Sequence, residues 1–272
     1  MVELEYVKKR KRKKLAGVLT AVASAGIGMF VLVAFLGRFV GTFTVALNTG
    51  SVKLSLYKSS EFEDPTSYIK IDQLPPFDLE TFSRLPSSEK LDTDKHGADY
   101  GTETDSFGNT VMKYFKYTFF IRNEGSIPAS YYVSVNITKN EPSISDRYGT
   151  RYLDQILRVM VYQNDPSLDT HNYTVYAKKS ESPNKMGNGE ETYKEYLSIG
   201  FDSESNPNPL FAEPFESSDV VTTIPDLNFQ PNEAKRYTLV AWLEGADPQA
   251  QGEAPEGANL KLGVTINAYE NK

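Results

Sequence analysis

Residues 115–138 read FKYTFFIRNEGSIPASYYVSVNIT, and this stretch decides the fold class. Apolar or aromatic residues recur at every second position in both halves, at Phe115, Tyr117, Phe119, Ile121, Tyr131, Val133, Val135 and Ile137. Because successive side chains of a strand point to opposite faces, this alternation predicts two strands, each with one buried face. Residues 123–126 (NEGS) have turn chemistry, with Gly125 free to take a positive φ. We therefore expect a long β-hairpin here.

Period-two alternation continues through much of the remaining chain, in residues 52–56, 157–162, 173–177, 237–243 and 260–268. In the last of these runs Leu260, Leu262, Val264, Ile266 and Ala268 all point one way. About seven strands separated by polar loops with Pro and Gly predict a mainly β fold, an antiparallel β-sandwich. Jelly-roll and Ig-like topologies both remain open. After residue 37 we expect helix only as a single turn over 152–157.

Three segments interrupt the strand pattern: residues 58–110, residues 178–218 and the acidic stretch EGADPQAQGEAPEGA over 244–258. Loops of this length are usually functional or mobile. No linker divides the chain after residue 47, so we expect one extracellular domain over 38–272.

The amino-terminal segment differs from the rest in charge and hydropathy. Residues 1–14 hold seven basic and two acidic side chains, whereas residues 15–272 carry a net charge of −12. The basic side chains are Lys8, Lys9, Arg10, Lys11, Arg12, Lys13 and Lys14. The next 23 residues, 15–37, carry no charge, and as a helix they would span about 34 Å, enough for a bilayer core. The positive-inside rule then predicts a cytoplasmic tail over 1–14, a transmembrane signal anchor over 15–37 and an extracellular remainder.

Two other interpretations of this segment stay open. A basic run also occurs in nucleic-acid-binding patches, but the acidic remainder of the chain argues against a nucleic-acid partner. A cleaved secretory signal shares the basic start, although its apolar region is normally shorter. The best cleavage motif is Thr44-Val45-Ala46, which would leave Leu47 as the first residue.

Composition restricts the chemistry. The chain has no cysteine and two histidines, His96 and His171, and no His-Glu-x-x-His motif. Disulfide scaffolds, zinc–thiolate sites, cysteine nucleophiles and a helix-borne zinc hydrolase site are therefore excluded. We expect no catalysis and no obligatory cofactor.

Three segments together carry a resemblance to a known group. They are residues 48–56 (NTGSVKLSL), residues 116–126 (KYTFFIRNEGS) and residues 237–248 (YTLVAWLEGADP) followed by 260–268. The chain resembles uncharacterised signal-anchored surface proteins of Gram-positive bacteria with a WLEG-x-DP element. It is more distantly similar to the TasA/camelysin biofilm-fibre family. That second resemblance implies a jelly roll and polymerisation by donation of an amino-terminal strand, after signal cleavage, to the next subunit.

The most specific local motif is Asp92-x-Asp94-x-His96-Gly97-x5-Glu103, which has the spacing of a calcium loop. Carboxylates at this spacing surround a hard cation while the glycine allows the sharp turn. Asp92, Asp94 and Glu103 are therefore the candidate calcium ligands, although His96 replaces the usual Asp or Asn at position five. An ordinary solvated loop is the alternative.

A second acidic group consists of Glu244, Asp247, Glu253 and Glu256, and we expect a solvated hairpin loop there. Trp242, the only tryptophan, lies in an alternating strand and is expected to be a core or edge aromatic.

These observations predict a membrane-anchored extracellular β-sandwich with a structural, adhesive or partner-binding role at the cell surface. Its expected partners are the lipid bilayer and either a cell-envelope protein or further copies of itself. The alternative is a secreted fibre subunit that assembles by donor-strand addition.

Overall fold

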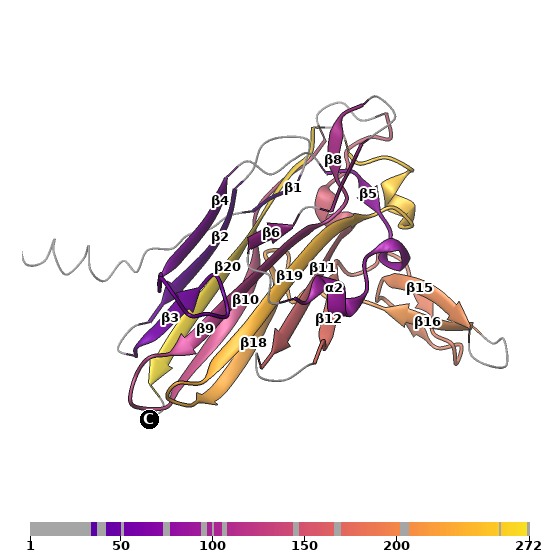
Figure 1. The fold of residues 1–272 in the computed structure, drawn as a ribbon. Helices are drawn as coiled ribbons and strands as arrows, with labels where there is room; N and C mark the ends of the chain where they lie inside the picture. The colour runs from indigo at the N-terminus through magenta and orange to yellow at the C-terminus, as the bar shows by residue number, and fades with distance from the viewer. Residues whose placement is uncertain are drawn as a thin grey trace, which may run out of the picture. The chain divides into compact units, whose positions relative to one another are not determined.

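The computed structural model describes residues 34–36, 42–49, 52–72, 77–93, 97–99, 101–104, 108–143, 147–165, 170–201, 207–255 and 257–270. The described part is mainly β, as the alternation predicts, and contains two large sheets (Figure 1). Sheet A has six strands, in the order β18-β10-β20-β2-β4 with β1 also paired to β20. Their bounds are β1 Ala34–Leu36, β2 Thr42–Asn48, β4 Tyr68–Asp72, β10 Ala129–Glu141, β18 Val220–Phe229 and β20 Asn259–Glu270.

Sheet B has eight strands, in the order β17-β12-β11-β19-β9-β3, with β5 paired to β19 and β6 paired to β9. Their bounds are β3 Leu54–Tyr57, β5 Leu79–Glu80, β6 Gly97–Asp99, β9 Phe115–Asn123, β11 Leu157–Asn164, β12 Tyr173–Ala177, β17 Glu213–Pro214 and β19 Ala234–Glu244. The runs predicted over 157–162, 173–177, 237–243 and 260–268 are all strands.

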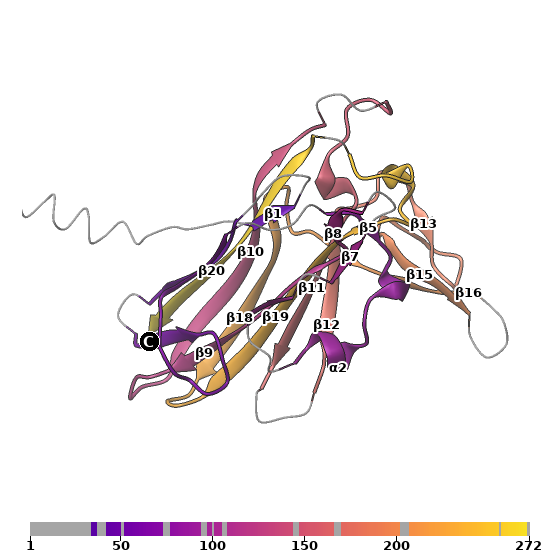
Figure 2. The ribbon, with the colours of Figure 1, turned by 45° about the horizontal axis from the view of Figure 1, so that its top comes forward.

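Shorter elements fill the segments between these strands. Three small hairpins pair β7 Thr102–Thr104 with β8 Thr110–Met112, β13 Asn184–Lys185 with β14 Glu191–Thr192, and β15 Tyr196–Phe201 with β16 Pro207–Phe211. The hairpin β15–β16 projects from the two large sheets in both views (Figure 2). The helical elements are η1 Phe82–Arg84, α2 Ser88–Leu91, η2 Leu153–Gln155 and η3 Pro248–Ala250, and η2 confirms the turn expected over 152–157.

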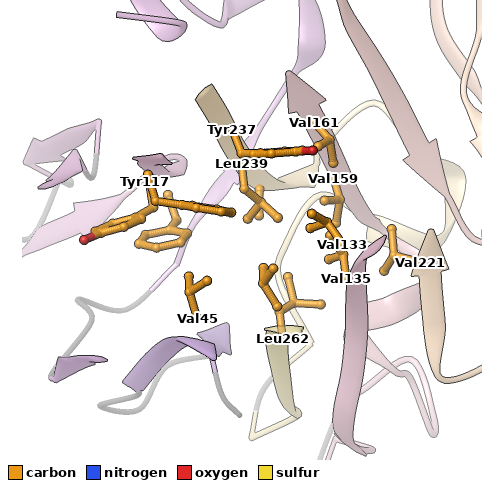
Figure 3. Close-up of a cluster of buried hydrophobic side chains, with 14 of the residues drawn as sticks. Val45, Tyr117, Val133, Val135, Val159, Val161, Val221, Tyr237, Leu239 and Leu262 are labelled. Atoms are coloured by element: carbon orange, nitrogen blue, oxygen red, sulfur yellow. The ribbon is translucent and has the colours of Figure 1, made fainter. Parts of the chain in front are cut away.

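The main core lies between sheets A and B. Side chains of the two sheets point toward one another there, with Tyr117, Leu239 and Val159 of sheet B opposite Val45, Leu262 and Val133 of sheet A (Figure 3). These are the residues on the predicted apolar faces: Leu260, Leu262, Val264 and Ile266 are each at most 1% exposed. Burial of apolar area on both inner faces is the main stabilising term of such an arrangement.

Sheet B is covered on its outer face as well. A second cluster contains Met160, Tyr162, Val240 and Trp242 of the sheet, packed with Leu91 of α2. The expectation that Trp242 is a buried aromatic is confirmed, since it is 0% exposed and its ring stacks on Phe82 of η1 at 6.2 Å. Parts of the two long polar segments, 58–110 and 178–218, therefore form a cover over this face.

The predicted hairpin over 115–138 is wrong. β9 pairs with β3, β6 and β19 of sheet B, whereas β10 pairs with β18 and β20 of sheet A. The connection passes from one sheet to the other, stabilised by Asn123, whose Nδ2 donates to Ile127 O at 3.0 Å and Phe229 O at 2.9 Å. Gly125 does not take a positive φ; instead a Cβ there would lie 3.0 Å from Asn123 Oδ1. Alternation predicts which face is buried but not which strand is the neighbour.

The fully antiparallel sandwich is also only partly correct. β2 runs parallel to β20 and antiparallel to β4, with Val45 opposite Val264 and Ile69. An amino-terminal strand thus lies inside sheet A, between β20 and β4.

Most of the amino-terminal segment lies outside the described residues. The basic side chains of 8–14 and residues 15–33 of the expected transmembrane span belong to this part. The expectation of helix is wrong for Ala34–Leu36, which form β1 and pair with Leu260–Leu262 of β20. Within the described ranges, no helix has both the length and the apolar character needed to cross a membrane.

Candidate functional site

Asp92, the first residue of the calcium-loop motif, belongs to a buried ion pair. It follows α2 and is 1% exposed. Arg236 donates to both of its oxygens, from Nε at 3.1 Å and from Nη2 at 2.8 Å. Thr238 Oγ1 donates at 2.8 Å, Asn164 Nδ2 donates as well, and His171 Nδ1 lies 3.3 Å away. Both carboxylate oxygens are thus engaged by protein groups, which attach the end of α2 to the outer face of sheet B.

The other predicted calcium ligands are placed differently. Glu103 lies on the short strand β7, is half exposed, and its nearest ion-pair partner is Lys113 at 3.8 Å. Asp94 lies outside the described residues. Among the described residues, no group of three or more His, Asp or Glu side chains is arranged to hold a metal ion.

The WLEGADP segment, residues 242–248, forms a buried polar junction at the end of β19. Glu244 is 1% exposed and accepts from Trp242 Nε1 at 3.0 Å, from Phe82 N at 3.1 Å and from Ala246 N at 3.1 Å. Gly245 N donates to Glu80 O at 2.7 Å, and a Cβ on Gly245 would lie 3.2 Å from the Cβ of Leu79. The solvated loop expected here is therefore wrong for Glu244, whose three donors replace water.

Asp247 continues this junction toward β11. Its Oδ1 accepts from Gln249 N at 2.9 Å and caps η3, and its Oδ2 accepts from Arg158 Nη2 at 2.6 Å. The side chains of Asp247 and Arg158 are 0% and 1% exposed. Arg158 lies on the outer face of sheet B, beside Trp242 of β19 and Ala177 of β12. A charged group at such a position requires a partner of opposite charge, and Asp247 supplies it.

A cavity of about 540 Å³ opens beside this ion pair. Its walls come from three parts of the chain that are far apart in sequence: residues 180–184, the start of β15, and η3 with the residues before it. Arg158 and Asp247 form its charged base. Leu197, Ala246 and Pro248 add apolar surface. Ligand sites commonly combine a mainly apolar wall with a few convergent polar groups.

Glu195 is the third charged group at the base of the cavity. Its side chain is 9% exposed, and its Oε2 lies 3.9 Å from Arg158 Nη2. Burial raises the pKa of the Glu195 carboxyl above its ordinary value, and the nearby Asp247 charge raises it further, while Arg158 lowers it. Arg158 is thus shared between two carboxylates and pairs closely only with Asp247.

Two buried polar atoms of the lining residues have no hydrogen-bond partner among the described residues: the donor Nε of Arg158 and the acceptor Oε1 of Gln249. Leaving such atoms unsatisfied is costly and calls for an explanation. The cavity, with the buried carboxylate of Glu195 at its base, is the best candidate functional site.

The walls of the cavity are held in place by local contacts. Tyr196 Oη donates to Lys185 O at 2.8 Å, and the Tyr196 ring packs on Phe211 with centroids 4.8 Å apart. Asn184 Nδ2 donates to Lys194 O at 2.9 Å. These contacts order the segment 184–196 without closing the cavity.

The sequence alone predicts only some of the residues of this site. Arg158 interrupts the otherwise apolar strand 157–162, and a charged residue at a buried position signals a buried partner. Asp247 was identified within an acidic group, but as solvated. The other members of that group differ from it: Glu253 is exposed and pairs with Arg147 at 3.1 Å, and Glu256 lies outside the described residues. No signal in the sequence singles out Glu195.

Comparison with known proteins gives no relative from which a function follows: no family model, no curated protein and no solved structure matches the chain.

Proposed function

We propose that this protein is a membrane-anchored β-sandwich on the outer side of the cell membrane, where it binds a ligand or partner through the cavity at Arg158, Glu195 and Asp247, without catalysis. The observation that carries the binding role is the cavity itself. It is about 540 Å³ in volume, its walls are ordered by their own contacts, and its base holds the Glu195 carboxylate, which lies 3.9 Å from Arg158 Nη2.

The amino-terminal sequence supports the location. Since Ala34–Leu36 are a strand, the anchor in this proposal is residues 15–33, which as a helix would measure about 28 Å. This length still suits a hydrocarbon core of roughly 30 Å. The seven basic residues of 8–14 would remain on the cytoplasmic side and contact anionic lipid.

The alternative is a secreted fibre subunit that assembles by donation of its amino-terminal strand after cleavage before Leu47. The position of β2 favours the anchored form. Cleavage there would cut β2 within its length and remove Val45, which is 0% exposed, from the core. The resemblance to signal-anchored surface proteins and to the fibre family remains a hypothesis, as does the choice between jelly-roll and Ig-like topology.

The absence of cysteine allows a direct test of where the cavity faces. Single cysteines are introduced by Ser182→Cys, at the exposed rim of the cavity, and by Glu3→Cys in the basic tail. Intact cells are then treated with a membrane-impermeant maleimide. We expect labelling of the Ser182→Cys chain in intact cells and of the Glu3→Cys chain only after lysis.

Ser218→Cys, at an exposed site away from the cavity, serves as the control for an outside position. Labelling of Glu3→Cys in intact cells, with Ser182→Cys and Ser218→Cys labelled only after lysis, would contradict the proposal.

A further inference from the structure

The charge of the cavity indicates what it binds. Among its lining residues, Arg158 is opposed by Glu181, Glu195 and Asp247, which leaves an excess of two negative charges. Two nearby lysines are engaged elsewhere: Lys178 Nζ pairs with Asp154 at 2.8 Å, and Lys194 Nζ pairs with Glu213 at 2.5 Å. Glu195 and Asp247 are buried, whereas Glu181 is exposed. An excess of negative charge of this kind favours a cationic ligand.

The hydrogen-bonding character of Glu195 agrees with this sign. Its carboxylate is an acceptor, and an ammonium group brings three donors. Arg158, in contrast, is a donor and would favour an acceptor. Because Arg158 already faces two carboxylates, the net charge decides in favour of the cation.

The apolar part of the lining completes the match. Leu197, Ala246 and Pro248 offer a surface that suits methylene groups rather than a fully hydrated ion. An aliphatic chain that ends in an ammonium group buries its stem on apolar surface and keeps its charge at a polar group.

We propose that the cavity binds a primary ammonium group carried on an aliphatic stem, with Glu195 as its counter-ion. This inference rests on the proposed function, in which the cavity is a binding site. The lysyl side chain of a protein and a free alkylamine share this chemistry.

The test uses the full chain in detergent micelles and saturation-transfer NMR with three probes of equal chain length. They are n-butylamine (cationic at neutral pH), 1-butanol (neutral) and butyrate (anionic). We expect n-butylamine to bind at least about tenfold more tightly than the other two. Preferential binding of butyrate would overturn the proposal and assign the cavity to an acceptor ligand of Arg158. Equal binding of all three, or of none, would overturn it as well.

Two matched variants locate the effect. Glu195→Gln keeps the shape of the side chain and should weaken the binding of n-butylamine at least about tenfold. Glu253→Gln removes a charge from an exposed pair outside the cavity and should leave binding unchanged. Equal affinity in the wild type and Glu195→Gln would overturn the role of Glu195.

Affinity should also fall as the pH is lowered, because only ionised Glu195 attracts the cation. Burial raises the pKa of Glu195, and the charges of Asp247 and Glu181 raise it further. Arg158 and a hydrogen bond with Ser180 lower it, and the net direction is upward. The loss should therefore begin at a higher pH than an ordinary glutamate gives, and it should be absent in Glu195→Gln.

Nα-acetyl-lysine methylamide distinguishes the two sources of the ligand. Tighter binding than n-butylamine assigns the cavity to a lysine of a protein partner, and weaker binding assigns it to a small free amine; both results support the ammonium class. Failure of every amine, with Ser182→Cys still labelled on intact cells, would refute the ligand class but not the surface location. Amine binding without surface labelling would support the ligand class and refute the surface location.

Discussion

At the residue scale, the buried charges of this protein serve two different purposes. Asp92, Glu244 and Asp247 are each satisfied by several donors and join the covering segments to sheet B. Glu195 is buried to a similar extent, but its basic neighbour is 3.9 Å away and pairs more closely with Asp247. Burial raises the pKa of Glu195, and a buried carboxylate with a raised pKa is typical of a binding position rather than of a structural one.

Glu195→Gln should therefore stabilise the ligand-free protein at neutral pH, by on the order of 1 kcal/mol. Since the pKa of Glu195 is raised above 4.5 in the folded state, the folded protein holds this proton more tightly than the unfolded chain. The favourable contribution of the Glu195 proton to the unfolding free energy is complete below the pKa of the unfolded chain. It is lost as the pH rises through the pKa of the folded protein. Chemical denaturation at pH 4 and pH 7 measures this contribution. Glu195→Gln should be more stable than the wild type at pH 7, and a lower stability of the variant at that pH would contradict this account.

The two ends of the calcium-loop motif should respond differently to removal of their charge. Asp92→Asn leaves Arg236 buried opposite a neutral group and should cost about 3–5 kcal/mol of unfolding free energy. Glu103→Gln removes one exposed charge 3.8 Å from Lys113 and should change stability by less than about 0.5 kcal/mol.

Thermal melts in calcium and in chelator provide the second measurement for this pair. We expect no shift of Tm, because the oxygens of Asp92 are occupied by protein donors. A rise in Tm with calcium that Asp92→Asn and Glu103→Gln both abolish would support the calcium loop.

At the element scale, the period-two pattern predicted the strands well and pairing poorly. The prediction of one buried face holds for much of β10 but is wrong for β9, which is buried on both faces. Burial depends on each side chain's own polarity, so Tyr131, Val133 and Val135 could be assigned from sequence. Pairing depends on where the connection leads, and Asn123 directs it across the core rather than into a hairpin. The outer cover of sheet B was missed for a similar reason, since its apolar residues, such as Leu91 and Phe82, are isolated in polar segments.

The strand β2 is the element on which the anchored and cleaved forms differ most. Removal of residues 1–41 keeps β2, whereas removal of 1–46 deletes the residues that pair with Tyr68–Asp72 and exposes β20 at Val264 and Thr265. The second truncation should be less stable than the first by at least about 3 kcal/mol, from lost ladder hydrogen bonds and the buried Val45. Urea denaturation of the two truncated chains measures the difference; equal midpoints would show that cleavage before Leu47 is tolerated.

At the scale of the whole molecule, the proposed protein has a basic tail, then an apolar segment, and then a mainly β unit with a cavity at Arg158, Glu195 and Asp247. The mainly β character was available from periodicity, and the location stays a prediction from composition. The cavity was not, because residues 158, 195 and 247 come from separate segments and are brought together only by packing on the outer face of sheet B.

The intact mass of the protein recovered from washed membranes and from culture medium tests the central proposal most directly. The anchored protein predicts a full-length species of 30.5 kDa confined to the membrane fraction. A species in the medium that begins at or near Leu47 would contradict the anchor and would make strand donation between subunits the explanation to pursue.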